Sequence, residues 1–228
     1  MLASLFAGLV AGTLHALSGP DHLAAITPLS ISHHETSKAG GAWRVGLRWG
    51  LGHALGVAAM GTLLLAFQQA LDLDRFAWWG ERLVGVVLVG VGIWGLRRAT
   101  SQWVHSHHHE HDGSEHAHIH FHRPGETTES TATHRHSHTA FAVGVLHGFA
   151  GTTHLFGLLP ALALPTAFAT VYLGGYGAGN LLAMGGFAWV AGWAGATFNA
   201  WGMSAYRILL GTASTGAIAV GAVWLFAR

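Results

Sequence analysis

Three residues that could bind a metal ion or carry a proton lie inside the first hydrophobic run of the sequence. They are His15, Asp21 and His22, within HALSGPDHLAAI at residues 15–26. A charged side chain at the centre of a bilayer costs roughly 3 kcal/mol on insertion scales, so such residues indicate a function rather than a packing role. Imidazoles with one carboxylate suit Ni²⁺, Co²⁺, Zn²⁺ or Cu²⁺ better than Ca²⁺ or Cu⁺.

The Gly19-Pro20 pair between these residues predicts an interrupted helix. Proline lacks a backbone N–H and fixes its own φ, so we expect a second half-helix to begin beside it. The interruption would free backbone carbonyls and reorient the neighbouring side chains. Asp21 could then ligate a metal directly, or accept the second N–H of a ligating imidazole and fix its tautomer. The sequence leaves both roles open.

The second half of the chain repeats this pattern. LHALSGPDHLAAITPL at residues 14–29 aligns with LHGFAGTTHLFGLLPAL at 146–162, which pairs His15 with His147 and His22 with His154. A unit of three spans runs through the membrane in the opposite direction when it is repeated. Inverted repeats with broken helices at matching positions are typical of transporters.

The second run of each half also aligns. RWGLGHALG at 48–56 matches GYGAGNLLA at 175–183 and pairs His53 with Asn180. Small residues let neighbouring helices approach closely, so His53 could reach the first run. The residues that we expect to form an intramembrane metal site are His15, Asp21, His22, His53, His147 and His154.

The elements that position these residues are six hydrophobic runs, at about 2–29, 45–71, 76–96, 141–164, 167–195 and 207–227. Hydrophobic residues make up 51% of the 228 residues and charged residues only 9%, against about a quarter charged in soluble domains. We therefore predict an all-α integral membrane protein. Six transmembrane helices would form a 3+3 inverted repeat with broken first and fourth helices.

This prediction divides the chain into 1–98, the first three-helix repeat, 99–139, a disordered cytoplasmic loop, and 140–228, the second repeat. No signal peptide is evident, because the first run is long and lacks a basic n-region. Eight of the 11 Lys and Arg residues fall in the loops after the first, third and fifth runs. By the positive-inside rule we expect both termini outside and these loops in the cytoplasm, in the cytoplasmic (inner) membrane.

The loop at 99–139 contains twelve of the 19 histidines, in HSHHHEHDGSEHAHIHFHR and HRHSH. Its polarity and low complexity argue against a packed core. Alternating histidines offer many interchangeable ligand pairs, and a solvated linker is the alternative interpretation. The auxiliary cytoplasmic metal-binding residues predicted here are His105, His107, His108, His109, His111, His116, His118, His120 and His122.

Several of these motifs resemble the nickel/cobalt transporter superfamily. HALSGPDHLAAI resembles its His-x4-Asp-His signature, although five residues separate His15 from Asp21 here, and RWGLGHALG is similar to its second-span motif. HGFAGTTHLFGLLPALALP looks like the fourth span of the short UreH-like branch, and the histidine-rich loop resembles the efflux branch. The resemblance implies that His15, Asp21, His22 and His53 form a selectivity site.

The predicted function is transport of nickel, or alternatively cobalt, as the substrate, with uptake favoured. Efflux by proton antiport is the main alternative, and a metal sensor or storage protein and a membrane di-iron oxidase are two others. We expect no enzymatic activity and no prosthetic group. The expected partners are the divalent metal ion, the lipid bilayer and cytoplasmic nickel chaperones or nickel-enzyme maturation proteins, and no nucleic acid.

Overall fold

The computed structural model describes residues 1–33, 41–67, 72–100, 104–111, 114–121, 136–150 and 157–226. Its helices, in chain order, are α1 (Leu2–Ser18), α2 (Pro20–His33), α3 (Trp43–Phe67), α4 (Leu73–Thr100), α5 (His136–Ala150), α6 (Leu159–Leu162), α7 (Thr166–Ala200) and α8 (Met203–Phe226). Each predicted hydrophobic run therefore contains at least one helix, and the predicted helical architecture is confirmed.

The first hydrophobic run is broken where the sequence predicts it. The α1 helix ends at Ser18, and the extended backbone of the next residue, Gly19 (φ −78°, ψ 106°), stops the helical hydrogen bonding. Pro20 begins α2, since the first position of a helix needs no N–H donor. The two helices are bent by 72° at this break.

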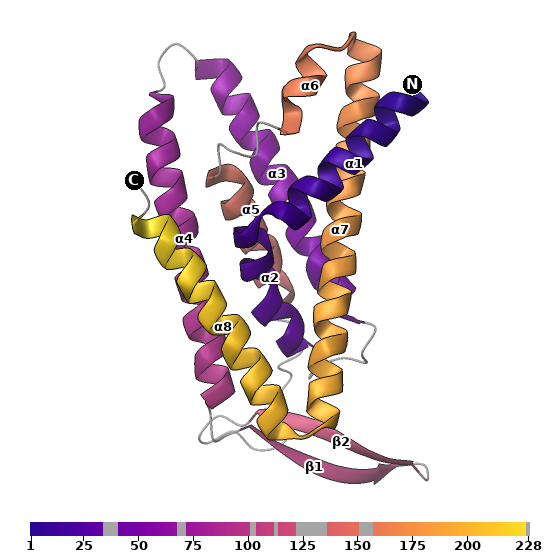
Figure 1. Cartoon of the computed structure of the whole chain (residues 1–228), viewed down its shortest axis with the longest axis vertical. Coiled ribbons are helices and arrows are strands. Elements are labelled where there is room, and N and C mark those ends of the chain that lie inside the picture. The colour runs from indigo at the N-terminus through magenta and orange to yellow at the C-terminus, as the bar shows by residue number, and fades with distance from the viewer. Residues whose placement is uncertain are drawn as a thin grey trace.

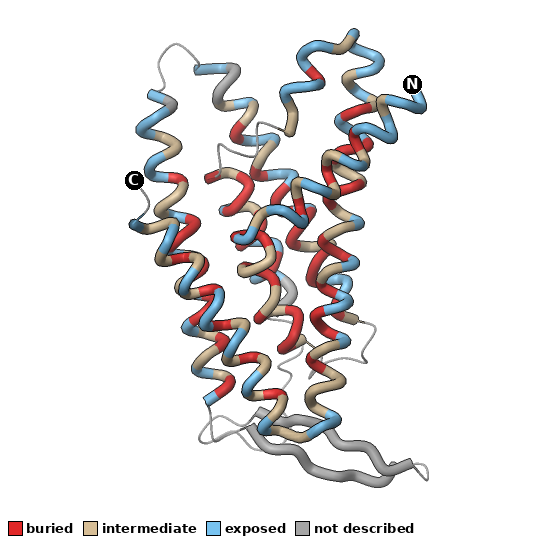
Figure 2. The backbone as a smooth tube through the Cα atoms, viewed as in Figure 1, coloured by how far each residue is buried: buried red, intermediate tan, exposed pale blue. Residues whose placement is uncertain are grey.

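The long helices pack in three pairs, which are visible in Figure 1 as α4 beside α8, α1 beside α7, and α3 beside α5. Glycines allow these close contacts. A Cβ atom on Gly8 or Gly12 would collide with backbone atoms of α7, and one on Gly52 or Gly56 would collide with the backbone of α5. The α2 half-helix lies among these pairs, and buried residues gather around it (Figure 2).

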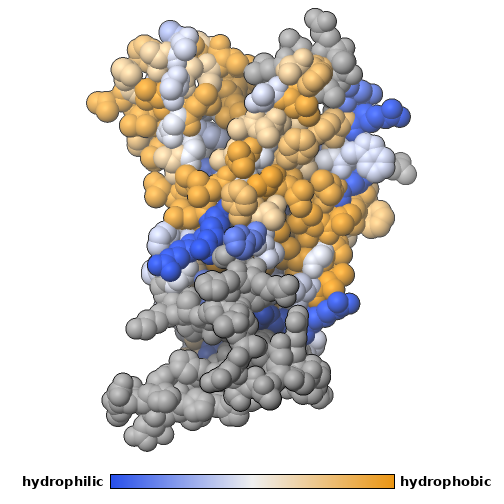
Figure 3. Space-filling view, turned by 180° about the vertical axis from the view of Figure 1, so that it is seen from behind, coloured by the Kyte–Doolittle hydropathy of each residue, from blue (hydrophilic) through white to orange (hydrophobic). Residues whose placement is uncertain are grey.

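Three described helices are long and apolar enough to cross a membrane: Asp74–Thr100, Thr166–Ala200 and Met203–Phe226. The bent pair of α1 and α2 makes a fourth candidate if it forms one span. Large apolar side chains such as Trp79, Leu182 and Ile208 are exposed, and hydrophobic atoms cover a broad part of the face in Figure 3. The outer surface is therefore suited to lipid rather than to water.

The fourth run is divided between α5 and the short helix α6. The sequence predicts its interruption at GFAGTT, residues 148–153, but α5 continues to Ala150, and residues 151–153 and His154 lie outside the described residues. Two strands, β1 (Val104–His111) and β2 (Ser114–Phe121), follow α4 and pair in antiparallel fashion, although the sequence predicts a disordered loop there. The helices on either side reach Thr100 and His136, so α5 begins four residues before the predicted boundary at 140.

Candidate metal centre

Five of the six residues predicted for the intramembrane metal site meet at one place. His15 comes from the last turn of α1, Asp21 and His22 from the first turn of α2, His53 from α3 and His147 from α5. The exposed fraction is 1% for His22, 2% for His53, 1% for His147 and 7% for Asp21. The break between α1 and α2 therefore delivers ionisable groups to the interior of an apolar bundle.

These residues form two overlapping groups of possible ligands. His15, His22 and His53 make one group, and in it the ligand atoms all lie within 4.8 Å of one another. The ring centroids of His15 and His22 are 4.9 Å apart, and those of His22 and His53 are 5.1 Å apart. Three imidazoles at this separation could converge on one transition-metal ion.

Asp21, His22 and His147 make the second group, with the same 4.8 Å limit. The Nε2 atom of His147 lies 3.0 Å from Oδ2 of Asp21. The ring of His147 is also 4.9 Å from that of His22. His22 therefore belongs to both groups, so a cation could be bound by either group while it stays coordinated to His22.

The broken helix also orients His22. Its Nδ1 atom lies 3.3 Å from the backbone carbonyl oxygen of Ala16. Ala16 is in the last turn of α1, where carbonyls have no helical N–H partner. A carbonyl oxygen only accepts, so Nδ1 is the donor of this hydrogen bond, and in the neutral imidazole this tautomer makes Nε2 the nitrogen that can ligate a metal ion. Hydrogen bonds of this kind fix the tautomer and direction of a ligating imidazole.

Close packing of α3 against α5 sets the distance between His53 and His147. A Cβ atom on Gly148 would collide with the backbone carbonyl of His53, and one on Gly144 would collide with that of Trp49. The helix backbones therefore touch at the level of the site. As a result, the ring centroids of His53 and His147 are 5.9 Å apart.

Two aromatic residues that the sequence reasoning missed complete the site. Trp49 is fully buried and stacks on His53, with ring centroids 5.0 Å apart and planes inclined by 7°. Its ring is also 5.3 Å from that of His22. Tyr176, on α7, lies 5.6 Å from the ring of His15. A signal was present, because Trp49 precedes His53 by four residues and so shares its helix face.

The other predicted metal-binding residues are placed as follows. His105, His107, His108, His109 and His111 lie on β1, and His116, His118 and His120 lie on β2. The strand register sets His105, His107 and His109 opposite His120, His118 and His116. His122 and His154 lie outside the described residues.

The chain is similar to two proteins from Arabidopsis thaliana. It is 35% identical over 187 residues to "Chloroplast protein FOR GROWTH AND FERTILITY 1" and 34% identical over 188 residues to "Chloroplast protein FOR GROWTH AND FERTILITY 2". Each match covers 82% of this chain, but 48% of the first relative and 46% of the second. The chain thus spans about half the length of the curated relatives it matches. No family model and no solved structure matches it.

These comparisons overturn the assignment to the nickel/cobalt transporter superfamily. The relatives found are plant chloroplast proteins, and no family model matches. The motifs that suggested the assignment are histidines beside glycine and proline in apolar runs. Any intramembrane imidazole site at a helix break needs these residue types, so they indicate a kind of site rather than common descent.

Proposed function

We propose that the chain carries a divalent transition-metal cation across a membrane through the site formed by His15, Asp21, His22, His53 and His147. The observation that carries the proposal is that four imidazoles and one carboxylate meet inside an apolar helical bundle, at a broken helix. Ionisable groups in such a place mark ion pathways, because burying them there is costly.

The arrangement of the helices supports a six-span inverted repeat. If α1 with α2, α3 and α4 are spans one to three, then α5 with α6, α7 and α8 are spans four to six. In such a repeat, exchanging the two halves converts the α1–α7 pair into the α5–α3 pair and leaves the α4–α8 pair unchanged. These are the three helix pairs that contact each other most extensively.

The direction of each pair fits the same scheme. Successive glycine contacts, such as Gly8 with Tyr172 and Gly12 with Tyr176, run the same way along α1 and α7, as odd-numbered spans should. By contrast, α4 and α8 run in opposite directions, because Gly85 lies near Gly221 and Gly95 near Ser214.

The site carries the same relationship. In the aligned second spans Trp49 corresponds to Tyr176, since each stands four residues before His53 or Asn180. His15 lies 5.6 Å from the ring of Tyr176, and its counterpart His147 lies 5.5 Å from the ring of Trp49. Sites near the midplane at the interface of such repeats are a feature of secondary transporters.

The ligand chemistry favours borderline divalent cations such as Ni²⁺, Co²⁺, Zn²⁺ and Cu²⁺ over Ca²⁺ or Cu⁺. Nickel remains the first cation to test, with cobalt next. A doubly charged ion gains about 4.6 kcal/mol on moving inward across 100 mV of inside-negative potential. Uptake through the cytoplasmic membrane therefore needs no second ion, whereas efflux would need a coupled proton gradient.

The test is flux of ⁶³Ni²⁺ into proteoliposomes that hold the full chain, with an imposed inside-negative potential and no pH gradient. We expect accumulation that His147→Ala abolishes and His138→Ala leaves unchanged. His138 is the matched control because it is an exposed histidine of the same helix. Outward movement of nickel that requires an inward-directed proton gradient would establish efflux by antiport instead. Tight nickel binding without any flux would favour the storage or sensor interpretation.

A further inference from the structure

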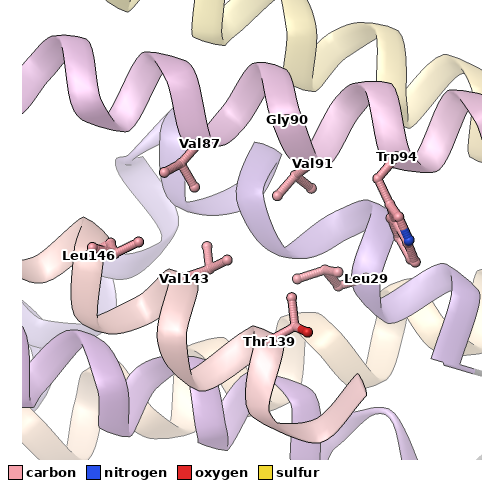
Figure 4. Close-up of a pocket in the computed structure, with 8 residues that line it drawn as sticks. All are labelled: Leu29, Val87, Gly90, Val91, Trp94, Thr139, Val143 and Leu146. Atoms are coloured by element: carbon pink, nitrogen blue, oxygen red, sulfur yellow. The ribbon is translucent and has the colours of Figure 1, made fainter. Parts of the chain in front are cut away.

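A cavity that is separate from the metal centre lies between α2, α4 and α5. It has a volume of about 610 Å³. Figure 4 shows its lining residues pointing into the space between α4 and α5, with α2 behind. They are Leu29, Val87, Gly90, Val91, Trp94, Thr139, Val143 and Leu146.

The lining of this cavity, called here the α4–α5 groove, is almost entirely apolar. Thr139 is the single hydroxyl among its eight residues, and no charged side chain lines it. Gly90 leaves additional room, because a Cβ atom built there would meet no atom within 4 Å. A space of this chemistry cannot satisfy a polar solute, but it suits a hydrocarbon chain.

One end of the groove is marked by an aromatic ring and two cations. Trp94 lines the groove, and the guanidinium carbon of Arg98 lies 5.5 Å from the centroid of its ring. Arg97 and Arg98 form the last turn of α4, and Arg97 is exposed. Tryptophan and arginine at a helix end are typical of the membrane–water interface, where lipid headgroups lie.

We propose that the α4–α5 groove binds one acyl chain of an anionic phospholipid whose headgroup contacts Arg97 and Arg98. The apolar lining holds the chain, and the two guanidinium groups select a negatively charged headgroup over a zwitterionic one. Basic pockets between transmembrane helices recognise anionic lipids in this way. The inference is independent of the metal centre, because none of its residues is a proposed ligand.

Native mass spectrometry of the delipidated full chain, titrated with phosphatidylglycerol and phosphatidylcholine, tests the proposal. We expect one phosphatidylglycerol to bind in preference to phosphatidylcholine. Gly90→Leu, which fills the groove, should weaken that binding at least tenfold. Gly186→Leu is the matched control, since Gly186 is also an exposed helical glycine with nothing within 4 Å of an added Cβ atom. The double variant Arg97→Gln/Arg98→Gln should bind both lipids equally.

Unchanged phosphatidylglycerol binding by Gly90→Leu, or a preserved headgroup preference in the double variant, would overturn the proposal. A wild-type dimer that Gly90→Leu dissociates would also overturn it, because the occupant would then be a second copy.

A second experiment, quenching of tryptophan fluorescence by a phosphatidylglycerol brominated on its acyl chain, does not need a variant that fills the groove. We expect it to lower the fluorescence of the wild type more than that of Trp94→Phe, and equal quenching would contradict the assignment.

Discussion

The Nδ1 atom of His22 donates a hydrogen bond to the carbonyl oxygen of Ala16, 3.3 Å away, across the break between α1 and α2. The acceptor has no helical N–H partner, because α1 ends two residues later, at Ser18, and the residue four positions on, Pro20, has no N–H. The interruption of the helix therefore does two things at once. It brings His15 and His22 to one place, and it fixes the orientation of the His22 ring.

His22→Ala should have the largest effect of any single histidine substitution, because His22 belongs to both ligand groups. We expect nickel affinity to fall at least about 100-fold, since changes in residues that only orient ligands already cost 10- to 100-fold. His15→Ala and His147→Ala each remove a ligand from one group, so their losses should be smaller. Isothermal titration calorimetry of the purified proteins measures the difference, and equal losses in all three would contradict the shared role.

Gly19→Ala should weaken metal binding without removing a ligand. An added Cβ atom would lie about 2.5 Å from Nδ1 of His22 and 2.9 Å from its Cγ, so the imidazole must move. We expect the affinity for nickel to fall roughly tenfold, in the range for disturbed ligand orientation. Gly61→Ala is the control, because nothing lies within 4 Å of its Cβ position. Equal affinities in these two variants would mean that His22 is not held where the structure places it.

Asp21→Asn should reduce flux by at least tenfold while the protein still inserts and folds. The change keeps the side-chain shape but removes the negative charge that lies 3.0 Å from Nε2 of His147. A divalent cation in a low-dielectric interior then loses its only nearby anionic ligand among the described residues. Asp72→Asn, at the exposed start of α4, is the matched control. Full transport by Asp21→Asn would exclude the carboxylate from the site.

Gly148→Ala should destabilise the protein, because its Cβ atom would collide with the backbone carbonyl of His53. Overpacking of this kind costs about 1–3 kcal/mol, which exceeds the roughly 0.5–1 kcal/mol that alanine gains over glycine in a helix. Gly174→Ala, on α7 with open space around it, should instead be neutral or slightly stabilising. Thermal unfolding in detergent compares the two, and a Gly148→Ala protein as stable as wild type would contradict the close α3–α5 contact.

The main features of this site could be predicted from the sequence because they depend on composition and local chemistry. An Asp and two His residues in an apolar run, beside Gly19-Pro20, indicated both the helix break and the ionisable side chains that meet beside it. Trp49 and Tyr176 were missed because a lone aromatic residue on a helix is usually a packing residue. Only the packing of α3 and α7 against other helices brings their rings to His22 and His15.

The family assignment failed for a different reason. The glycine and histidine motifs report the residue types that suit an intramembrane imidazole site, and residue types alone do not establish common descent. The α4–α5 groove lay beyond sequence reasoning, since Leu29, Val91 and Val143 are distant in the chain and no pattern links them.

The glycine contacts also determine which parts of the molecule can move against one another. Backbone contacts backbone at the glycines of the α1–α7 and α3–α5 pairs. Separating the two helices of a pair would break all of these contacts, so we expect each pair to move as a rigid unit. His53 and His147 belong to the α3–α5 pair and His15 belongs to the α1–α7 pair. The α2 helix lies between the two pairs and is joined to α1 through Gly19. Rotation of one helix pair against the other would separate His15 from His53 and so break up the first ligand group. The chain contains no cysteine, so cysteine pairs can be introduced to cross-link chosen helices. A cross-link between the two helix pairs should stop transport, whereas one within a pair should not.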